Sequence, residues 1–164
     1  MKKEEEYYPP IKTKIEELLT SKAVNFYLEI TANKKFSNKL KAEIREGRDI
    51  IFQILKEASP DITGFIKKDS WADFIVIEFK RENLKLDDIY QTRKYRDLFA
   101  AKFAFLISLE PIPEEIKRLR KVTFELLSMP HYTHAFTLAQ FNEETQNFIE
   151  WYPENPFEKD TCWK

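Results

Sequence analysis

The chain has 164 residues, a length that suits a single domain, residues 1–164, with its own hydrophobic core. Hydrophobic residues make up 43% of the chain and aromatic residues 15%, which is too apolar for a disordered protein. The formal net charge is −1, so there is no overall positive field that would hold a polyanion by charge alone.

The cysteine count and the distribution of apolar residues exclude further classes of protein. Cys162 is the one cysteine, so neither an intrachain disulfide nor a zinc site of several cysteines can form. The N-terminus, MKKEEEYYPP, has no apolar stretch behind its charges, and nowhere do about 18 uncharged apolar residues run together. We therefore expect a cytoplasmic protein with no membrane partner.

Charge is unevenly distributed along the chain. Residues 31–56 hold seven Lys or Arg against three acids, whereas residues 141–164 hold six acids against two lysines. The basic region could contact phosphate groups while the acidic tail provides solubility. The alternative is that these are two solvated faces of different composition.

The first half of the chain alternates between helical and strand patterns. Residues 11–22 carry apolar side chains three and four positions apart, which predicts an amphipathic helix, and residues 24–31 alternate like a strand. A basic loop or helix follows, broken at Gly47, and leads to a predicted helix over 49–57 that ends before Pro60. Residues 61–66 and 73–80 then read as two strands of a hairpin.

The second half continues this order. We predict helices over residues 85–102 and 113–128, a buried strand over 103–110, and two edge strands over 134–141 and 146–152. The whole order predicts an α/β fold in which a mixed central β-sheet is flanked by helices.

The end of the strand over 73–80 is unexpectedly polar. Because side chains alternate between faces, Glu78 and Lys80 point the same way, and the hairpin could bring Asp61 alongside them. Two carboxylates suit Mg²⁺, which takes oxygen ligands, and the Phe79 carbonyl could add a third. Lys80 could orient a water molecule or stabilise developing charge during phosphodiester hydrolysis.

A simpler interpretation of each feature exists. Glu-x-Lys on one face of a strand is a common ion pair, and Pro-Asp frequently begins a turn. Taken together, however, Pro60-Asp61, a gap of sixteen residues and Glu78-Phe79-Lys80 resemble the motif of the PD-(D/E)xK nuclease superfamily. Gln91 and Tyr95 match the Gln-x-x-x-Tyr pattern of the following helix in many members.

The resemblance covers residues 11 to about 110, and residues 111–164 lie beyond it. It implies a restriction-endonuclease-like fold and a nuclease dependent on Mg²⁺ or Mn²⁺, with DNA as the favoured substrate. By the same resemblance Asp61 and Glu78 would be metal ligands, Lys80 the catalytic lysine, and Gln91 and Tyr95 residues that organise the site. Many members add a glutamate from the first helix, for which this chain offers Glu16 or Glu17.

Other candidates are weaker. His131 and His134 could bind metal if helical, but they follow Pro130 in an expected loop. The basic stretch 117–121 suits a solvated helix face, and with two glycines the chain has no glycine-rich phosphate loop. The alternative function is a non-catalytic module on the same fold that binds nucleic acid or protein. A homodimer would suit cutting of two strands, and the aromatic tail could pack on its own domain or on a second subunit.

Overall fold

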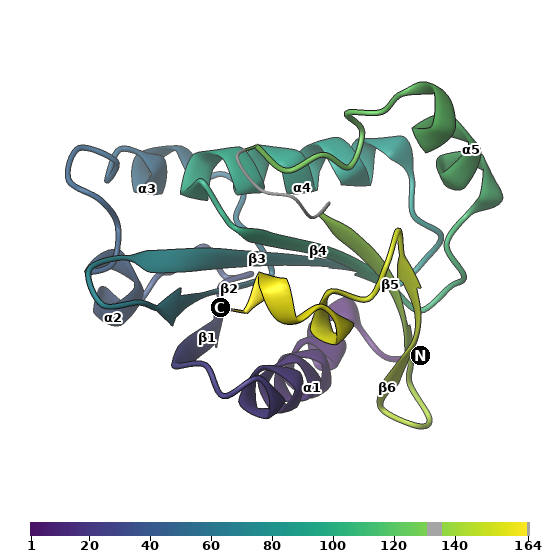
Figure 1. Cartoon of the computed structure of the whole chain (residues 1–164), viewed down its shortest axis with the longest axis horizontal. Helices are drawn as coiled ribbons and strands as arrows, with labels where there is room; N and C mark the ends of the chain where they lie inside the picture. The colour runs from purple at the N-terminus through teal and green to yellow at the C-terminus, as the bar shows by residue number, and fades with distance from the viewer. Residues whose placement is uncertain (131–135, 164) are drawn as a thin grey trace.

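A six-stranded mixed β-sheet lies at the centre of the molecule, with helices on both faces (Figure 1). The structure is a computed structural model that describes residues 1–130 and 136–163. The strands, in their spatial order, are β1 (Phe26–Ile30), β2 (Ile62–Lys67), β3 (Ala72–Lys80), β4 (Phe103–Ser108), β5 (Thr137–Asn142) and β6 (Asn147–Tyr152). The expected mixed α/β architecture is confirmed.

Five helices and three short 3₁₀ turns surround the sheet in the described part of the chain. The helices are α1 (Tyr8–Ser21), α2 (Asn38–Lys41), α3 (Ile51–Ile54), α4 (Leu86–Phe99) and α5 (Glu114–Val122). The 3₁₀ turns are η1 (Glu4–Tyr7), η2 (Pro156–Glu158) and η3 (Asp160–Cys162). Among the described residues, no helix combines the length and the apolar character needed to cross a membrane.

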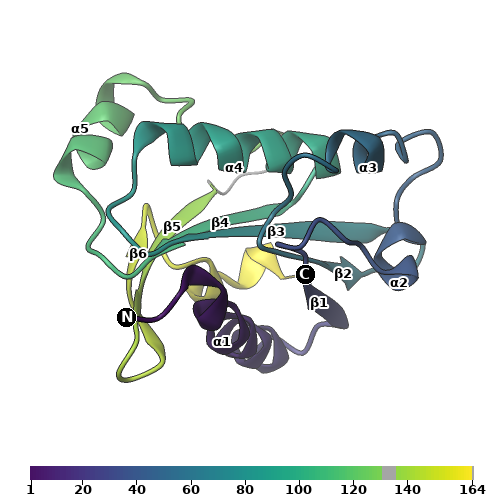
Figure 2. The same cartoon turned by 180° about the vertical axis from the view of Figure 1, so that it is seen from behind.

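The sheet divides the core into two layers. Phe74 and Val76 of β3 pack with residues of α4, whereas Ile75, Ile77 and Phe79 pack with residues of α1 and of the C-terminal segment. Figures 1 and 2 show α3, α4 and α5 on one side of the sheet and α1 on the other. The predicted alternation of β3 is therefore confirmed, and Glu78 and Lys80 share the α4 side with Phe74 and Val76.

Strand direction changes across the sheet. The pairs β1–β2, β2–β3 and β5–β6 are antiparallel, whereas β3–β4 and β4–β5 are parallel, and α4 connects β3 to β4. Gly64 lies where β1 and β2 approach closely, because a Cβ there would overlap the Tyr27 carbonyl and the Leu28 side chain. The glycine thus allows the normal spacing of this strand pair.

Several sequence-based boundaries differ from the structure. The predicted helix over 113–128 ends at Val122, because Thr123 leaves the helical conformation and Leu126 and Leu127 turn into the core. The helix predicted over 49–57 is reduced to the single turn α3, and a second short helix, α2, forms in the basic segment before it. Short helices of this kind depend on packing more than on local propensity.

The C-terminal strands also need a correction. The strand expected over 134–141 begins at Thr137 and is interior rather than at an edge, because β5 pairs with both β4 and β6. Its buried residues Leu138 and Ala139 face opposite core layers, which suits an interior strand. The edge strand expected over 146–152 is confirmed as β6. His131 and His134 lie outside the described residues.

Candidate active site

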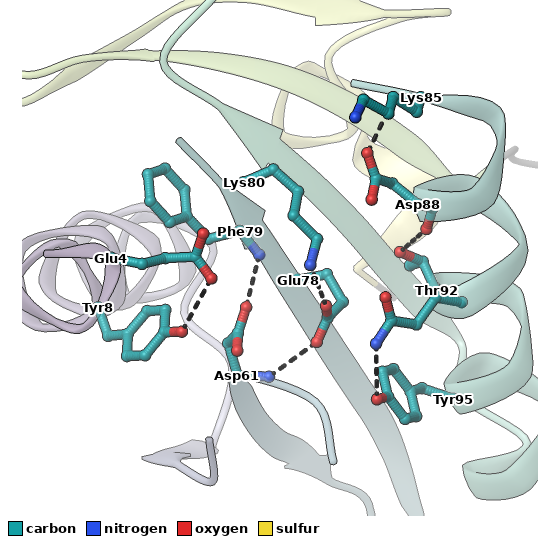
Figure 3. A network of polar contacts seen from close by, with 11 residues as sticks. Glu4, Tyr8, Asp61, Glu78, Phe79, Lys80, Lys85, Asp88, Thr92 and Tyr95 are labelled. Carbon is teal, nitrogen blue, oxygen red and sulfur yellow. Dashed lines mark hydrogen bonds and ion pairs between the residues drawn. The ribbon is translucent and has the colours of Figure 1, made fainter. Parts of the chain in front are cut away.

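Asp61 and Glu78 face each other across the β2–β3 pair. Ile62 pairs with Ile77, so one further step along each antiparallel strand sets Asp61 opposite Glu78. The backbone N–H of Asp61 donates to Glu78 Oε1 at 3.1 Å, and the N–H of Phe79 donates to Asp61 Oδ2 at 2.8 Å (Figure 3). Each carboxylate is therefore held by a backbone amide of the other carboxylate's strand segment.

Lys80 completes the expected trio. Its Nζ lies 3.8 Å from Glu78 Oε2, and its side chain is 28% exposed, whereas that of Glu78 is 4% exposed. The ammonium group thus reaches the buried carboxylate from the solvent side. The structure brings together Asp61, Glu78 and Lys80, as the hairpin prediction required.

Both carboxylates are costly to ionise in this environment. Burial raises the pKa of Asp61 to about 6, which outweighs the lowering by hydrogen bonds from the Phe79 amide and Tyr8. Burial and the adjacent charge of Asp61 raise the pKa of Glu78 well above its usual range, although Lys80 opposes this. The pair consequently retains a proton at pH values where exposed carboxyl groups are ionised.

Two residues near the N-terminus join the site although sequence reasoning did not select them. The Tyr8 hydroxyl lies 3.3 Å from Glu4 Oε1 and also interacts with Asp61. Burial and these acids raise the pKa of Tyr8, so the hydroxyl stays protonated. The charge of Glu4 in turn raises the pKa of both Asp61 and Glu78, which places a third acidic group next to the pair.

The glutamates expected from the first helix lie elsewhere. Glu16 pairs with Lys12 at 3.1 Å and Glu17 with Lys14 at 3.5 Å, both along the surface of α1. The acid that approaches Asp61 is Glu4, which lies in η1 before that helix. The run Glu4-Glu5-Glu6 before Tyr7-Tyr8 was the available signal, but nothing local shows that it packs beside residue 61.

Gln91 and Tyr95 lie on α4, one turn apart, on the side of the helix that faces β3. Gln91 Nε2 donates to the Tyr95 hydroxyl at 3.1 Å, a contact that a spacing of four residues along a helix allows; Figure 3 labels Tyr95 in this network. Burial raises the pKa of Tyr95 to about 12, and the charges of Glu78 and Asp61 add to this rise. The Tyr95 hydroxyl is therefore close enough to interact electrostatically with both carboxylates, and it remains protonated.

The side chains available as ligands limit which metal ion could bind at this site. Within residues 1–130 and 136–163, no group of three or more His, Cys, Asp and Glu side chains is arranged to hold a metal ion. A closed zinc site needs about four nitrogen or sulfur ligands, which this site lacks. Mg²⁺ commonly uses only one or two carboxylates, with water and substrate phosphate as the other ligands, and two buried carboxylates fit that pattern.

Phe79 has a defined role of another kind. Its amide anchors Asp61, and its side chain is fully buried, in ring contact with Tyr7 and Tyr8. These contacts fix the backbone between Glu78 and Lys80. A ligand role for the Phe79 carbonyl remains a prediction.

A separate cavity of about 730 Å³ lies at the opposite end of β3. Its lining includes Arg45, Arg48, Lys67 and the half-exposed Trp71, and none of the site residues above. This volume is in the range of about 300–1,000 Å³ that is usual for small-molecule pockets. This cavity is therefore distinct from the carboxylate site.

Comparison of the chain with protein-family models, with curated proteins and with solved structures finds no match. The functional assignment consequently depends on the residues of this chain and on their geometry.

Proposed function

We propose that the chain is a metal-dependent nuclease of the PD-(D/E)xK type that hydrolyses phosphodiester bonds, with DNA as the favoured substrate. The observation that carries the proposal is the reciprocally held pair Asp61 and Glu78 with Lys80 at 3.8 Å from Glu78. A restriction-endonuclease-like fold and a cytoplasmic location belong to the same proposal.

Asp61 and Glu78 would hold Mg²⁺ or Mn²⁺. Each carboxylate has one oxygen fixed by an amide, so the orientation of both groups is set before any ligand arrives. When bound, the ion would supply a water of lowered pKa and neutralise negative charge on the phosphate. Two acids that are hard to ionise together also favour replacement of their proton by a cation.

Lys80 would stabilise the negative charge that develops on the phosphate oxygens. Its ammonium group is partly exposed, so it is accessible to a substrate from solvent, while its pairing with Glu78 limits its range of positions. Gln91 and Tyr95 would help to orient the Glu78 side of the site, since their hydrogen-bonded pair lies close to that carboxylate.

Cleavage assays test the proposal directly. Supercoiled, linear and single-stranded DNA, and RNA, are incubated with Mg²⁺ or Mn²⁺ and in parallel with EDTA. The Glu78→Gln variant keeps the shape and the acceptor oxygen for the Asp61 amide, whereas Glu57→Gln alters an exposed acid and serves as the matched control. We expect metal-dependent cleavage that Glu78→Gln abolishes and Glu57→Gln preserves.

The alternative, a non-catalytic binding module, is favoured by the cavity beside Trp71. The cavity lining holds both basic side chains and the acids Glu43, Asp73 and Asp97, and its exposed indole could stack on an aromatic group without a metal. Nucleic-acid binding in EDTA that is lost in Trp71→Ala, with no cleavage of any substrate, would establish the module and exclude the nuclease. Cleavage that persists in Trp71→Ala would exclude the non-catalytic module.

A further inference from the structure

A buried cluster of hydroxyl groups lies beside the Pro60–Asp61 peptide and contacts its carbonyl group. Thr31, which follows β1, and Thr63 of β2 have no exposed surface, and Ser59 is also buried. Thr31 Oγ1 lies 2.6 Å from the Pro60 carbonyl oxygen and 2.7 Å from Thr63 Oγ1. Ser59 Oγ donates to the Thr31 carbonyl at 2.6 Å.

The direction of these hydrogen bonds follows from counting protons. A carbonyl oxygen can only accept, so the single hydroxyl proton of Thr31 points to Pro60. Thr63 must then donate to Thr31 Oγ1. The Thr31 backbone N–H in addition donates to the Asp61 carbonyl at 2.8 Å. Thr31 therefore holds the carbonyl groups on both sides of the Asp61 Cα atom.

The Pro60–Asp61 peptide group is held at both ends. The Pro60 carbonyl and the Asp61 N–H belong to one planar unit, so fixing the direction of one fixes that of the other. Thr31 binds the carbonyl end, and Glu78 Oε1 accepts from the N–H end. Because successive hydrogen bonds polarise one another, donation by Thr31 should also strengthen donation to Glu78.

We propose that Thr31 is a positioning residue of the active site, whose hydroxyl orients the Pro60–Asp61 peptide and, through it, both carboxylates. The inference rests on the proposed function and adds to it a residue that touches neither substrate nor metal. Thr31 acts through the peptide, so its loss should weaken metal binding without removing any ligand.

The test compares Thr31→Val, which removes the hydroxyl but keeps the shape, with Thr31→Ser, which keeps the hydroxyl. Thr137→Val is the matched control, because Thr137 is buried in β5, three strands from β2. The first readout is the rate of hydrogen exchange of the Asp61 backbone amide, which NMR measures in the metal-free proteins. The second is the Mn²⁺ concentration that gives half-maximal DNA cleavage. Both are measured at a temperature where thermal unfolding curves show every variant to be folded.

We expect Thr31→Val to speed exchange of the Asp61 amide and to raise the Mn²⁺ requirement about tenfold, as loss of an outer contact to a metal ligand typically does. Thr31→Ser should restore both quantities to near the wild-type values, and Thr137→Val should leave them unchanged. Thr31→Val with wild-type exchange at Asp61 and a wild-type Mn²⁺ requirement would overturn the inference.

The two readouts separate this inference from the proposed function. If the wild-type protein cleaves no substrate, the nuclease proposal fails, but exchange of the Asp61 amide still decides whether Thr31 orients the peptide. If the wild type cleaves and Thr31→Val behaves like Thr137→Val, Thr31 has no positioning role and the nuclease proposal stands.

Discussion

At each end of β3 a buried acid of the strand lies near a lysine, but the two ends differ in how charge is balanced. Asp73 and Asp61 are equally buried, each 8% exposed. Asp73 accepts from the Trp71 indole at 3.2 Å and lies 3.6 Å from Lys102 Nζ, so one acid has a cation and a donor. At the other end, Lys80 stands beside two mutually close carboxylates with Glu4 nearby.

The comparison separates an acid whose charge is compensated within the protein from a pair of acids whose charge is not. A buried acid that has a cation and a hydrogen-bond donor is compensated within the protein. Two facing acids with a single lysine are not, and such excess negative charge is typical of sites that receive a proton or a cation from outside. The following predictions test this difference, from the largest expected effect to the smallest.

Exchanging the two lysines for alanine should separate activity from stability. We expect Lys80→Ala to lower the cleavage rate roughly 10²- to 10³-fold, since it removes a group that stabilises developing charge. Lys102→Ala should retain the rate but lower the free energy of unfolding by about 1–3 kcal/mol, because Asp73 loses its cation. Rates come from cleavage assays and stabilities from urea unfolding. Equal rates in Lys80→Ala and wild type would remove Lys80 from the mechanism.

Neutralising the two aspartates should change stability in opposite directions. The pKa of Asp61 is about 6 in the folded protein and about 3.8 in the unfolded chain. Because the folded state binds this proton more tightly, the stabilisation from the protonated carboxyl group is fully present below pH 4 and is lost as the pH rises through 6. In EDTA at pH 8, Asp61→Asn should therefore raise the free energy of unfolding by roughly 3 kcal/mol, whereas Asp73→Asn should lower it. The gain should vanish below pH 4. Thermal unfolding across this pH range provides the measurement, and a destabilised Asp61→Asn at pH 8 would contradict the assignment.

Glu4→Gln tests whether Glu4 contributes to the site formed by Asp61 and Glu78. Because Glu4 reaches Asp61 through Tyr8, we expect the Mn²⁺ requirement for cleavage to rise roughly tenfold. Glu5→Gln, at an exposed neighbouring position in the same 3₁₀ turn, is the control. Indistinguishable behaviour of the two variants would place Glu4 outside the site.

Tyr95→Phe should have the smallest effect. It removes the acceptor of the Gln91 hydrogen bond, so we expect the free energy of unfolding to fall by about 1 kcal/mol. Tyr90→Phe, on an exposed position of the same helix, should be neutral. Urea unfolding of both variants checks this, and a loss in Tyr90→Phe as large as in Tyr95→Phe would argue against a specific role for the Gln91–Tyr95 pair.

The sequence predicted the parts of the site that depend on local periodicity. The two-residue repeat placed Glu78 and Lys80 on one face of β3, the hairpin brought Asp61 opposite Glu78, and helical spacing brought Gln91 to Tyr95. Each of these contacts follows from the geometry of one element or of two adjoining elements.

Long-range packing accounts for what the sequence did not predict. Glu4 and Thr31 reach residues 61 and 60 through tertiary contacts, and no periodic pattern indicates that partnership. The helix predicted over 113–128 was too long because burial of Leu126 and Leu127 outweighed a locally helical pattern. β5 was assigned to an edge because its pairing with β4 is visible only in the assembled sheet.

The hydrogen bonds from two backbone amides to the carboxylates of Asp61 and Glu78 form only when β2 and β3 are correctly aligned. A slip of β2 by one residue against β3 would turn Asp61 to the opposite face and set it against an apolar neighbour of Glu78. No misaligned form could then assemble the carboxylate pair. Gly64, whose neighbours in β1 leave no room for a side chain, separately restricts how β1 packs against β2. Any activity of this protein would therefore report the fraction of molecules that have paired their strands correctly.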